Sequence, residues 1–193
     1  MARPKSFDTE QALDKAMYLF TLKGYAGTSM QDLVVGMGIS RQSIYDTFGN
    51  KADLFGQALE KYGSMNQIHF SAPLSSPQAD MDTIRDRFDL LILEATQDKA
   101  HKGCMLVNCI VEMHLLDDKA SSRVSYFHGL WAEAFLNALN NAATKGQIRA
   151  EFANENMSHL LATLTSGLLI DAKAGTSAKT LSAVVDITLS IFA

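Results

Sequence analysis

The sequence predicts an all-α protein, and three observations lead to this prediction. Apolar residues recur at intervals of three and four along most of the chain, which is the period of an amphipathic helix. The 193 residues include only three prolines, Pro4, Pro73 and Pro77, and each lies where a helix is expected to begin or end. No segment alternates polar and apolar residues over the length of a strand. We therefore expect about nine helices and no β-sheet.

The composition is that of an ordinary soluble globular chain, with 47% hydrophobic and 20% charged residues. No apolar run reaches about 18 residues, so a membrane span is not expected. The N-terminus lacks the apolar segment of a signal peptide, and two cysteines, Cys104 and Cys109, are too few for a disulfide scaffold. We therefore expect a cytoplasmic protein.

The net charge of −4 does not by itself indicate a nucleic-acid-binding protein. Residues 1–62 carry seven Lys/Arg and seven Asp/Glu, whereas the remainder carries ten and fourteen. The N-terminal part is thus less acidic but hardly basic. Any DNA affinity there would depend on a few placed cations, namely Arg3, Lys5, Arg41 and Lys51.

A small core is predicted for the N-terminal part. Its first helix carries an amphipathic stripe formed by Leu13, Ala16, Met17 and Phe20. Residues of the following segment are expected to complete this core: Leu33, Ile39, Ile44 and Phe48. Such a core would hold the N-terminal helices at fixed angles to one another.

Residues 24–61 predict three helices separated by very short turns. Thr28 precedes Gln31 at the spacing of a Thr-x-x-Gln capping box, which can open the first of these helices. Gly38 can supply the positive φ that ends it, and Ser40 can cap the short helix that follows. Two helices joined by such a turn form a helix-turn-helix unit, whose second helix enters the major groove of DNA.

The second of these helices, roughly residues 41–47, is the predicted recognition helix. Ile44 faces the core, which leaves five side chains to face outward: Arg41, Gln42, Ser43, Tyr45 and Thr47. Arg41 can fork onto a guanine and Gln42 can pair with an adenine edge, although either could instead contact phosphate or only solvent. Asp46 could accept a bond from a cytosine amino group, bind Arg41 locally or point away from DNA. Thr28 and Ser29 lie at a predicted helix N-terminus, where N–H groups and hydroxyls favour a phosphate.

The ordered set of residues in this N-terminal third resembles the DNA-binding domain of the TetR family of bacterial transcriptional regulators. The matching positions are Ala16, Leu19, Phe20, Gly24, Tyr25, Thr28, Leu33, Gly38, Ile39, Ser40, Ile44, Tyr45, Phe48, Lys51 and Leu54. The resemblance implies a homodimeric regulator, in the majority of cases a repressor, that binds a palindromic double-stranded DNA operator and responds to a small-molecule inducer. It also makes Tyr45, together with Lys51, an expected phosphate contact. The candidate DNA-binding residues are therefore Thr28, Ser29, Ser40, Arg41, Gln42, Ser43, Tyr45, Thr47 and Lys51.

The domain organisation follows from this division. Residues 1–50 form the expected helix-turn-helix domain, a fourth helix capped by Asn50 links over 51–70, and residues 71–193 form the regulatory and dimerisation domain. A loop is expected over 71–77, then helices from about 76 to 98 and over 104–116. A long helix over 118–145 ends at Gly146, and two further helices begin at Asn154 and Ser177 and run to about 173 and 192.

The resemblance implies that the last two helices pair with those of a second subunit. Both are apolar on more than one face, as expected of helices between a core and a partner. The alternative is that they are core helices of a monomer. The candidate dimerisation residues are Leu160, Leu164, Leu168, Leu181, Val185 and Leu189.

The resemblance also places an inducer pocket within residues 81–152. Aromatic residues, methionines and a few polar groups there are consistent with an apolar ligand site, although most of them could equally be core packing. The candidate ligand-binding residues are Phe88, Cys104, Met105, Met113, Phe127 and Trp131.

The segment 102–112 is similar to a Gly-Cys-x-x-Val-Asn stretch of a TetR subgroup, some of whose members respond to electrophiles or oxidants. Cys104 follows His101 and Lys102 at an expected helix start, and both features favour the reactive thiolate. Cys104 is therefore a candidate sensor, and the alternative is an inert buried thiol.

Two other classes of function remain as alternatives. An enzyme is not expected, because the chain shows no ordered nucleophile, base and orienting acid, and no Gly-rich phosphate loop. The cysteines and histidines show no metal-ligand spacing, so neither a metal nor another cofactor is expected. The closer alternative is a DNA-binding regulator without ligand control that acts with a protein partner.

Overall fold

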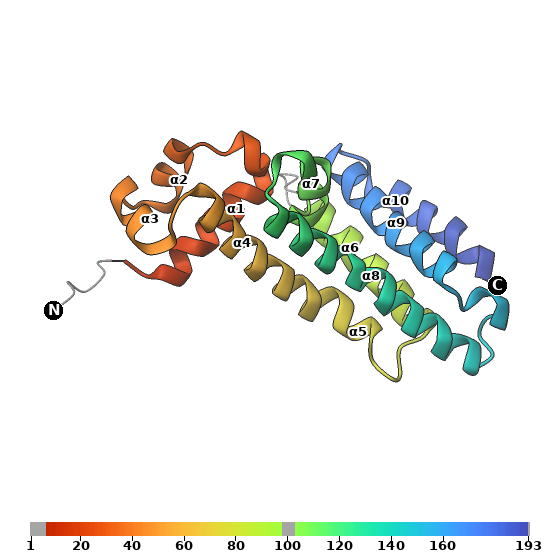
Figure 1. Cartoon of the computed structure of the whole chain (residues 1–193). Coiled ribbons are helices and arrows are strands. Elements are labelled where there is room, and N and C mark those ends of the chain that lie inside the picture. The colour runs from red at the N-terminus through yellow and green to blue at the C-terminus, as the bar shows by residue number, and fades with distance from the viewer. Residues whose placement is uncertain (1–6, 98–102, 193) are drawn as a thin grey trace.

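A computed structural model describes residues 7–97 and 103–192, and every regular element in these ranges is helical (Figure 1). The all-α prediction is therefore confirmed. Helices α1 to α3 gather at one end of the molecule, and α4 leads away from them along the side of a longer helical bundle. Arg3 and Lys5, named above as possible DNA-binding cations, lie outside the described residues. None of the described helices has the length and apolar character needed to cross a lipid bilayer.

The N-terminal unit contains α1 (Thr9–Gly27), α2 (Met30–Met37) and α3 (Arg41–Phe48). Phe20, Leu33, Ile44 and Phe48 are all buried, as the predicted small core requires. Gly38 has φ 71° and ends α2 in the left-handed conformation, so the turn between α2 and α3 forms as predicted.

The N-cap of α2 differs from the prediction. Ser29, not Thr28, caps this helix, and its partner is Asp32 rather than Gln31. The Ser29 hydroxyl accepts the Asp32 N–H at 3.0 Å, and the Asp32 carboxylate accepts the Ser29 N–H at 2.9 Å. The helix begins one residue later than predicted because a Ser-x-x-Asp pair makes the same reciprocal bonds.

Helix α4 (Lys51–Asn66) continues further than predicted. Its cap is Asn50, as expected, but a π-helical turn (Gln67–Ser71) and a single α-turn, α5 (Ala72–Leu74), extend it into the predicted loop over 71–77. Pro73 lacks the N–H that would bond the His69 carbonyl in an α-helix, and the guanidinium of Arg87 donates to that carbonyl instead. If α5 and the π-helical turn are counted as the continuation of α4, the described residues contain the nine helices that were predicted.

The bundle is completed by α6 (Met81–Gln97), α7 (Met105–Val111), α8 (Asp118–Thr144), α9 (Glu155–Lys173) and α10 (Ala178–Leu189). Short 3₁₀ turns follow α7 (Met113–Leu115), precede α9 (Ala150–Phe152) and follow α10 (Ser190–Phe192). Helix α6 begins five residues later than predicted, because Asp80 accepts the N–H groups of Asp82 and Thr83. Its expected last residue, Asp98, lies outside the described residues.

Helix α8 is the central helix of the bundle and packs on α4, α6, α7 and α9. Trp131 and Phe135 on α8 are completely buried, and the indole N–H of Trp131 donates to the side-chain oxygen of Asn66 at 2.7 Å. Helix α10 is joined to α6 by an ion pair between Asp186 and Arg85. The C-terminal helices α6 to α10 thus share one continuous core, with α4 along its side.

Candidate nucleic-acid interface

Helix α3 presents one face to solvent and the other to the core. The Ser40 hydroxyl accepts the N–H of Ser43 at 3.1 Å and so caps the helix, as predicted. Ile44 and Phe48 are 0% and 3% exposed and hold α3 against its neighbours. The outward side chains divide into exposed and half-buried ones: Arg41, Gln42 and Tyr45 are exposed, whereas Ser43 and Thr47 are half-buried.

Gln42 and Asp46 are bonded to each other on this exposed face. The Gln42 side-chain nitrogen donates to the Asp46 carboxylate at 2.7 Å. This bond differs from all three roles predicted for Asp46, which were a contact with cytosine, a contact with Arg41 and an orientation away from DNA. It holds the Gln42 amide along the helix axis and directs the carboxylate toward Gln42 rather than Arg41.

Thr28 is not available to a phosphate, so this part of the site prediction is wrong. Its side chain is 0% exposed, and its hydroxyl donates to the Gly24 carbonyl at 2.6 Å. Ser29 is exposed at the N-terminus of α2, with its hydroxyl bonded to Asp32 at 2.6 Å. Lys23 pairs with Asp32, and this bond holds the pKa of the carboxyl well below its ordinary value.

Lys51 lies at the first position of α4, close to the N-terminus of α2. Its ammonium group is 4.4 Å from the centre of the Tyr25 ring, a cation–π contact. Partial burial lowers the pKa of Lys51 from its ordinary value. The ring therefore fixes where this cation stands in the free protein.

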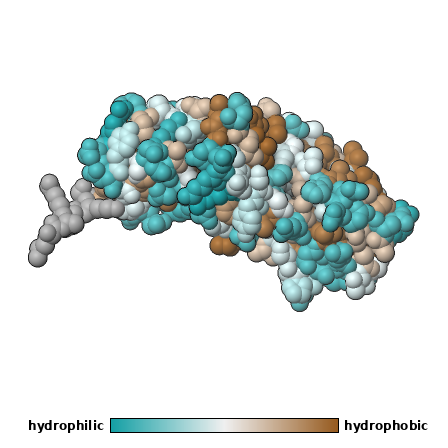
Figure 2. Space-filling model, in the orientation of Figure 1, coloured by the Kyte–Doolittle hydropathy of each residue, from teal (hydrophilic) through white to brown (hydrophobic). Residues whose placement is uncertain are grey.

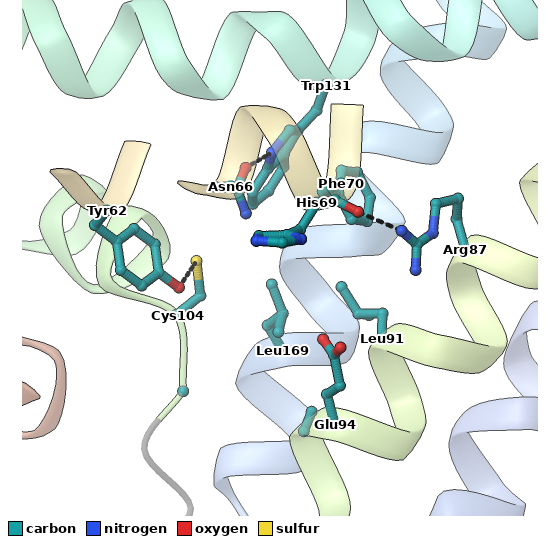
Figure 3. A pocket seen from close by; sticks show the side chains of 12 residues that line it. Tyr62, Asn66, His69, Phe70, Arg87, Leu91, Glu94, Cys104, Trp131 and Leu169 are labelled. Carbon is teal, nitrogen blue, oxygen red and sulfur yellow. Dashed lines mark hydrogen bonds between the residues drawn. The ribbon is translucent and has the colours of Figure 1, made fainter. Parts of the chain in front are cut away.

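A cavity of about 230 Å³ lies inside the regulatory part, between α4, α6, α7, α8 and α9 (Figure 3). Apolar side chains form much of its wall, among them Phe70, Leu91, Trp131 and Leu169. Arg87 and Glu94 supply charges on one side, and Tyr62 with Cys104 supplies a polar pair on another.

Cys104 lines this cavity, and of the two alternatives given for it the buried thiol agrees with its surroundings. The side chain is 4% exposed, and burial raises the pKa of the thiol. The Tyr62 hydroxyl donates to its sulfur at 3.3 Å, and burial likewise raises the pKa of Tyr62 well above its usual value. His101 and Lys102, the cations on which the expectation rested, lie outside the described residues. A protonated thiol is therefore the resting form.

Of the six predicted ligand-binding residues, only Cys104 and Trp131 line the cavity. Phe88 stacks on Phe135 with ring centres 5.6 Å apart, and Met105 is completely buried. Phe127 packs over Gly63, and Met113 belongs to the 3₁₀ turn after α7. The prediction missed lining residues on α4 and its π-helical turn, because it sought the pocket only within 81–152: Tyr62, Asn66, His69 and Phe70.

Two family models match the parts of the chain just described. The model for bacterial regulatory proteins of the tetR family matches residues 12–58, which include the helix-turn-helix unit. A model for the tetracyclin repressor-like C-terminal domain matches residues 81–187, more than half of the chain. The chain belongs to the TetR family. It is therefore a DNA-binding transcriptional regulator and not an enzyme.

Several TetR-type relatives are similar over most of the chain. The HTH-type transcriptional regulator YezE of Bacillus subtilis (strain 168) is 32% identical over 151 residues, 78% of each chain. The HTH-type transcriptional repressor ComR of Escherichia coli (strain K12) is 26% identical over 98% of this chain and 91% of its own.

Solved structures show the same fold. A cysteine mutant of the TetR family regulator CifR, complexed with 26-bp double-strand operator DNA, is 25% identical, with a TM-score of 0.83 over 99% of this chain and 100% of its own. The regulatory protein TetR from Rhodobacter sphaeroides reaches a TM-score of 0.86 at 17% identity, over 95% of this chain and 98% of its own.

The TetR-type dimerisation residues predicted on α9 and α10 divide into two groups. Leu168, Leu181 and Val185 are 2%, 1% and 0% exposed, so they belong to the core of their own subunit and are not surface residues. Leu160 is 38% exposed, and Leu164 and Leu189 are half-buried. Four further apolar residues are exposed on the same two helices and the turn after them: Ile170, Val184, Ile187 and Ile191. Figure 2 shows hydrophobic surface along the side of the molecule where Figure 1 places α9 and α10.

Proposed function

We propose that this TetR-family protein is a homodimeric repressor that leaves a palindromic operator when a small molecule occupies the cavity. The observation that carries the proposal is the short helix α3, whose outer side exposes Arg41, Gln42 and Tyr45 while Ile44 and Phe48 fix its position. Arg41 is the proposed guanine-reading residue, and Gln42 reads adenine once its bond to Asp46 opens. Tyr45, Lys51 and the N-terminus of α2 at Ser29 contact phosphates.

The dimer in this proposal forms through the exposed apolar residues of α9 and α10. Single exposed apolar residues are ordinary, but a contiguous group indicates an interaction surface. A two-fold pair of subunits spaces two recognition helices by about one DNA turn, roughly 34–36 Å, which makes the operator a palindrome. Repression is supported by the relatives named as repressors, ComR among them.

The proposed inducer is a small, uncharged molecule with an apolar body. Phe70, Leu91, Trp131 and Leu169 offer it apolar contact. Tyr62 and Cys104 are both neutral at physiological pH because burial raises their pKa values, so they offer the inducer hydrogen-bonding groups and no charge. Arg87 and Glu94 on another side of the cavity carry one charge of each sign, so together they do not favour a ligand of either charge. The inducer releases DNA only if it binds better to the conformation in which the recognition helices no longer match the grooves.

An electrophile or oxidant acting at Cys104 is the second form of signal in this proposal. It is supported by the position of the Cys104 sulfur in the cavity wall and by the Gly-Cys-x-x-Val-Asn segment that contains it. Reaction at this thiol requires that the protein first open or that the reagent enter the cavity, because the sulfur is buried.

The decisive experiment is selection of bound sequences from random duplex DNA by the purified full-length protein. We expect a palindrome whose half-sites lie about one helical turn apart. An asymmetric single half-site would contradict the dimer. A thermal-shift screen of small uncharged aromatic and aliphatic compounds then tests the cavity, since a ligand that binds the folded protein raises its melting temperature. Absence of any stabilising compound would favour a regulator that acts with a protein partner instead.

A further inference from the structure

Helix α7 touches the cavity with one end and the DNA-binding unit with the other. Cys104, its N-cap residue, lines the cavity and accepts the hydrogen bond from Tyr62. Glu112, at its C-cap, accepts the backbone N–H of Tyr25 at 2.7 Å. Tyr25 lies at the end of α1, directly before the N-terminus of α2. A single short helix therefore spans the distance between the two functional parts.

The contact at the Glu112 end is made where α1 is kinked. Gly24 has φ 74° and ψ 177°, which are non-helical values. In an uninterrupted α-helix the N–H of Tyr25 would bond the carbonyl of Thr21. Here the Tyr25 N–H donates to Glu112, and the Thr21 carbonyl accepts from the side-chain nitrogen of Asn108 at 2.8 Å. Two side chains of α7 thus bind both of the backbone groups that the kink separates.

Glu112 is also closely fitted to Gly24. A Cβ atom at residue 24 would lie 2.5 Å from the Glu112 carboxylate, far inside van der Waals contact. The Tyr25 ring that follows packs on Phe55 of α4, with ring centres 4.8 Å apart, and carries the ammonium group of Lys51 on its face. The position of Glu112 consequently fixes the segment that leads into α2, together with a proposed phosphate-binding cation.

Asn108 extends the same connection to α9. Its side-chain oxygen accepts from the ammonium group of Lys173 at 3.0 Å while its nitrogen holds Thr21. Helix α9 also contributes Leu169 to the cavity wall. A shift of either α7 or α9 therefore changes the bonds that hold the kink of α1.

We propose that α7 is the coupling element between the cavity and the helix-turn-helix unit, and that Glu112 and Asn108 are its positioning residues. This inference rests on the proposed control of DNA binding by the cavity. An occupant that displaces Cys104 moves α7, and the directional bonds from Glu112 and Asn108 carry the movement to α1 and the start of α2. The recognition helix then shifts relative to the recognition helix of the second subunit.

The test replaces the unidentified ligand by a side chain. Ala95 of α6 lines the cavity, so Ala95→Phe fills part of it, and Leu93→Phe on the exposed side of the same helix is the matched control. Affinity is measured for the duplex selected by the wild-type protein. Ala95→Phe is expected to weaken binding about tenfold, within the usual range of allosteric coupling, while Leu93→Phe leaves it within about twofold.

The same filling substitution is then placed on two Glu112 variants. In Glu112→Ala, which lacks the acceptor, Ala95→Phe is expected to weaken binding less than about twofold. In Glu112→Gln, whose side-chain oxygen still accepts the Tyr25 N–H, about tenfold weakening is expected to return. Asn108→Ala gives a second, independent test if Glu112→Ala does not fold, and Val111→Ala, at a 70% exposed position of α7, is the control.

Three results would overturn the inference. If Ala95→Phe weakens DNA binding equally in the wild type, Glu112→Ala and Asn108→Ala, the cavity still controls DNA binding. In that case α7 does not couple the cavity to the helix-turn-helix unit. If Val111→Ala reduces the effect of Ala95→Phe as much as Glu112→Ala and Asn108→Ala do, any change in α7 has the same effect. Glu112 and Asn108 then have no specific positioning role. If Ala95→Phe has no effect even in the wild type, the proposed control by the cavity fails, and the inference falls with it.

Discussion

At the residue scale, Arg41 and Gln42 are neighbours on α3, and we propose that they contact DNA in different ways. The Gln42 amide donates to Asp46 at 2.7 Å, so reading an adenine edge requires this bond to open. Arg41 is exposed one residue earlier, in the first turn of the helix. The guanidinium fork is also the side chain that most often makes a specific contact with guanine. Base preference is therefore expected to depend more strongly on Arg41.

The first prediction concerns Arg41→Ala. We expect it to relax the preference at one base position by roughly 1–3 kcal/mol, because a bidentate contact with guanine is lost. The measurement is repeated selection from random DNA, with binding constants for duplexes changed at each position. Equal weakening on every sequence would show that Arg41 contacts only phosphate.

A second prediction follows from the protonation of the two cysteines. Burial raises the pKa of Cys104 and raises that of Cys109 to about 12. A raised pKa keeps each thiol protonated until the pH exceeds its ordinary range, so thiolate is scarce at pH 7–8. Alkylation by iodoacetamide at pH 8 is expected to be more than about tenfold slower in the folded protein than in concentrated urea. Fast alkylation of folded Cys104 would instead support a sensor with direct access.

Individual side chains show where sequence reasoning reaches its limit. The caps at Ser40 and Asn50 were predictable because they depend only on neighbouring residues. Thr28 and Ser29 are adjacent hydroxyl residues that can both start a capping box, and only packing against α1 buries Thr28. The sequence left open whether Cys104 is a reactive sensor or a buried thiol for a related reason. Its pKa depends on burial beneath helices distant in sequence, which the local pattern does not contain.

At the element scale, the stability of α3 depends on its N-cap. Ser40→Ala removes the acceptor for the Ser43 N–H and is expected to lower the free energy of unfolding by roughly 0.5–2 kcal/mol. Ser125→Ala, at an exposed position inside α8, serves as the control and should change it by less than about 0.5 kcal/mol. Denaturant unfolding without DNA measures both. Equal effects from the two substitutions would mean that the cap adds nothing to the stability of the fold.

Most helices were predictable because their caps and periodicity are local, whereas the region around Pro73 was not. The proline correctly indicates a lost backbone bond, yet the rod continues through a π-helical turn. Pro73 has no N–H to donate to the carbonyl of His69, and this carbonyl instead accepts a hydrogen bond from Arg87 on α6. Likewise, the kink of α1 at Gly24 is bound by side chains of α7. Contacts between distant elements decide both cases, and no local pattern contains them.

At the scale of the whole molecule, the family and the helical architecture were predictable from ordered motif residues, but the surfaces were less so. The cavity draws its lining from α4 and the π-helical turn after it, α6, α8, α9 and the two residues before α7, and four of the six predicted residues pack elsewhere. On α9 and α10 an apolar residue on either face satisfies the same sequence pattern. Only the packed structure separates the buried Leu181 and Val185 from the exposed Val184 and Ile187.

The last prediction concerns the exposed apolar residues of α9 and α10. Ile187 is 70% exposed in the single subunit, so Ile187→Asp should leave the fold of that subunit unchanged. In a dimer formed through α10 the new carboxylate would be buried without a partner, which is strongly unfavourable. We expect the dimer dissociation constant, measured by sedimentation, to rise at least about a hundredfold, roughly 3 kcal/mol. Operator affinity should fall with it, because a palindrome needs both recognition helices.

The matched control is Val111→Asp on α7, at a position with the same 70% exposure. It introduces the same charge on another apolar surface and is expected to leave the dissociation constant within about twofold of the wild type. If Ile187→Asp sediments as the wild type does while Val111→Asp produces monomers, the subunits pair through the α7 surface. The two recognition helices would then be spaced by a different geometry, and the half-sites recovered by selection should be separated accordingly.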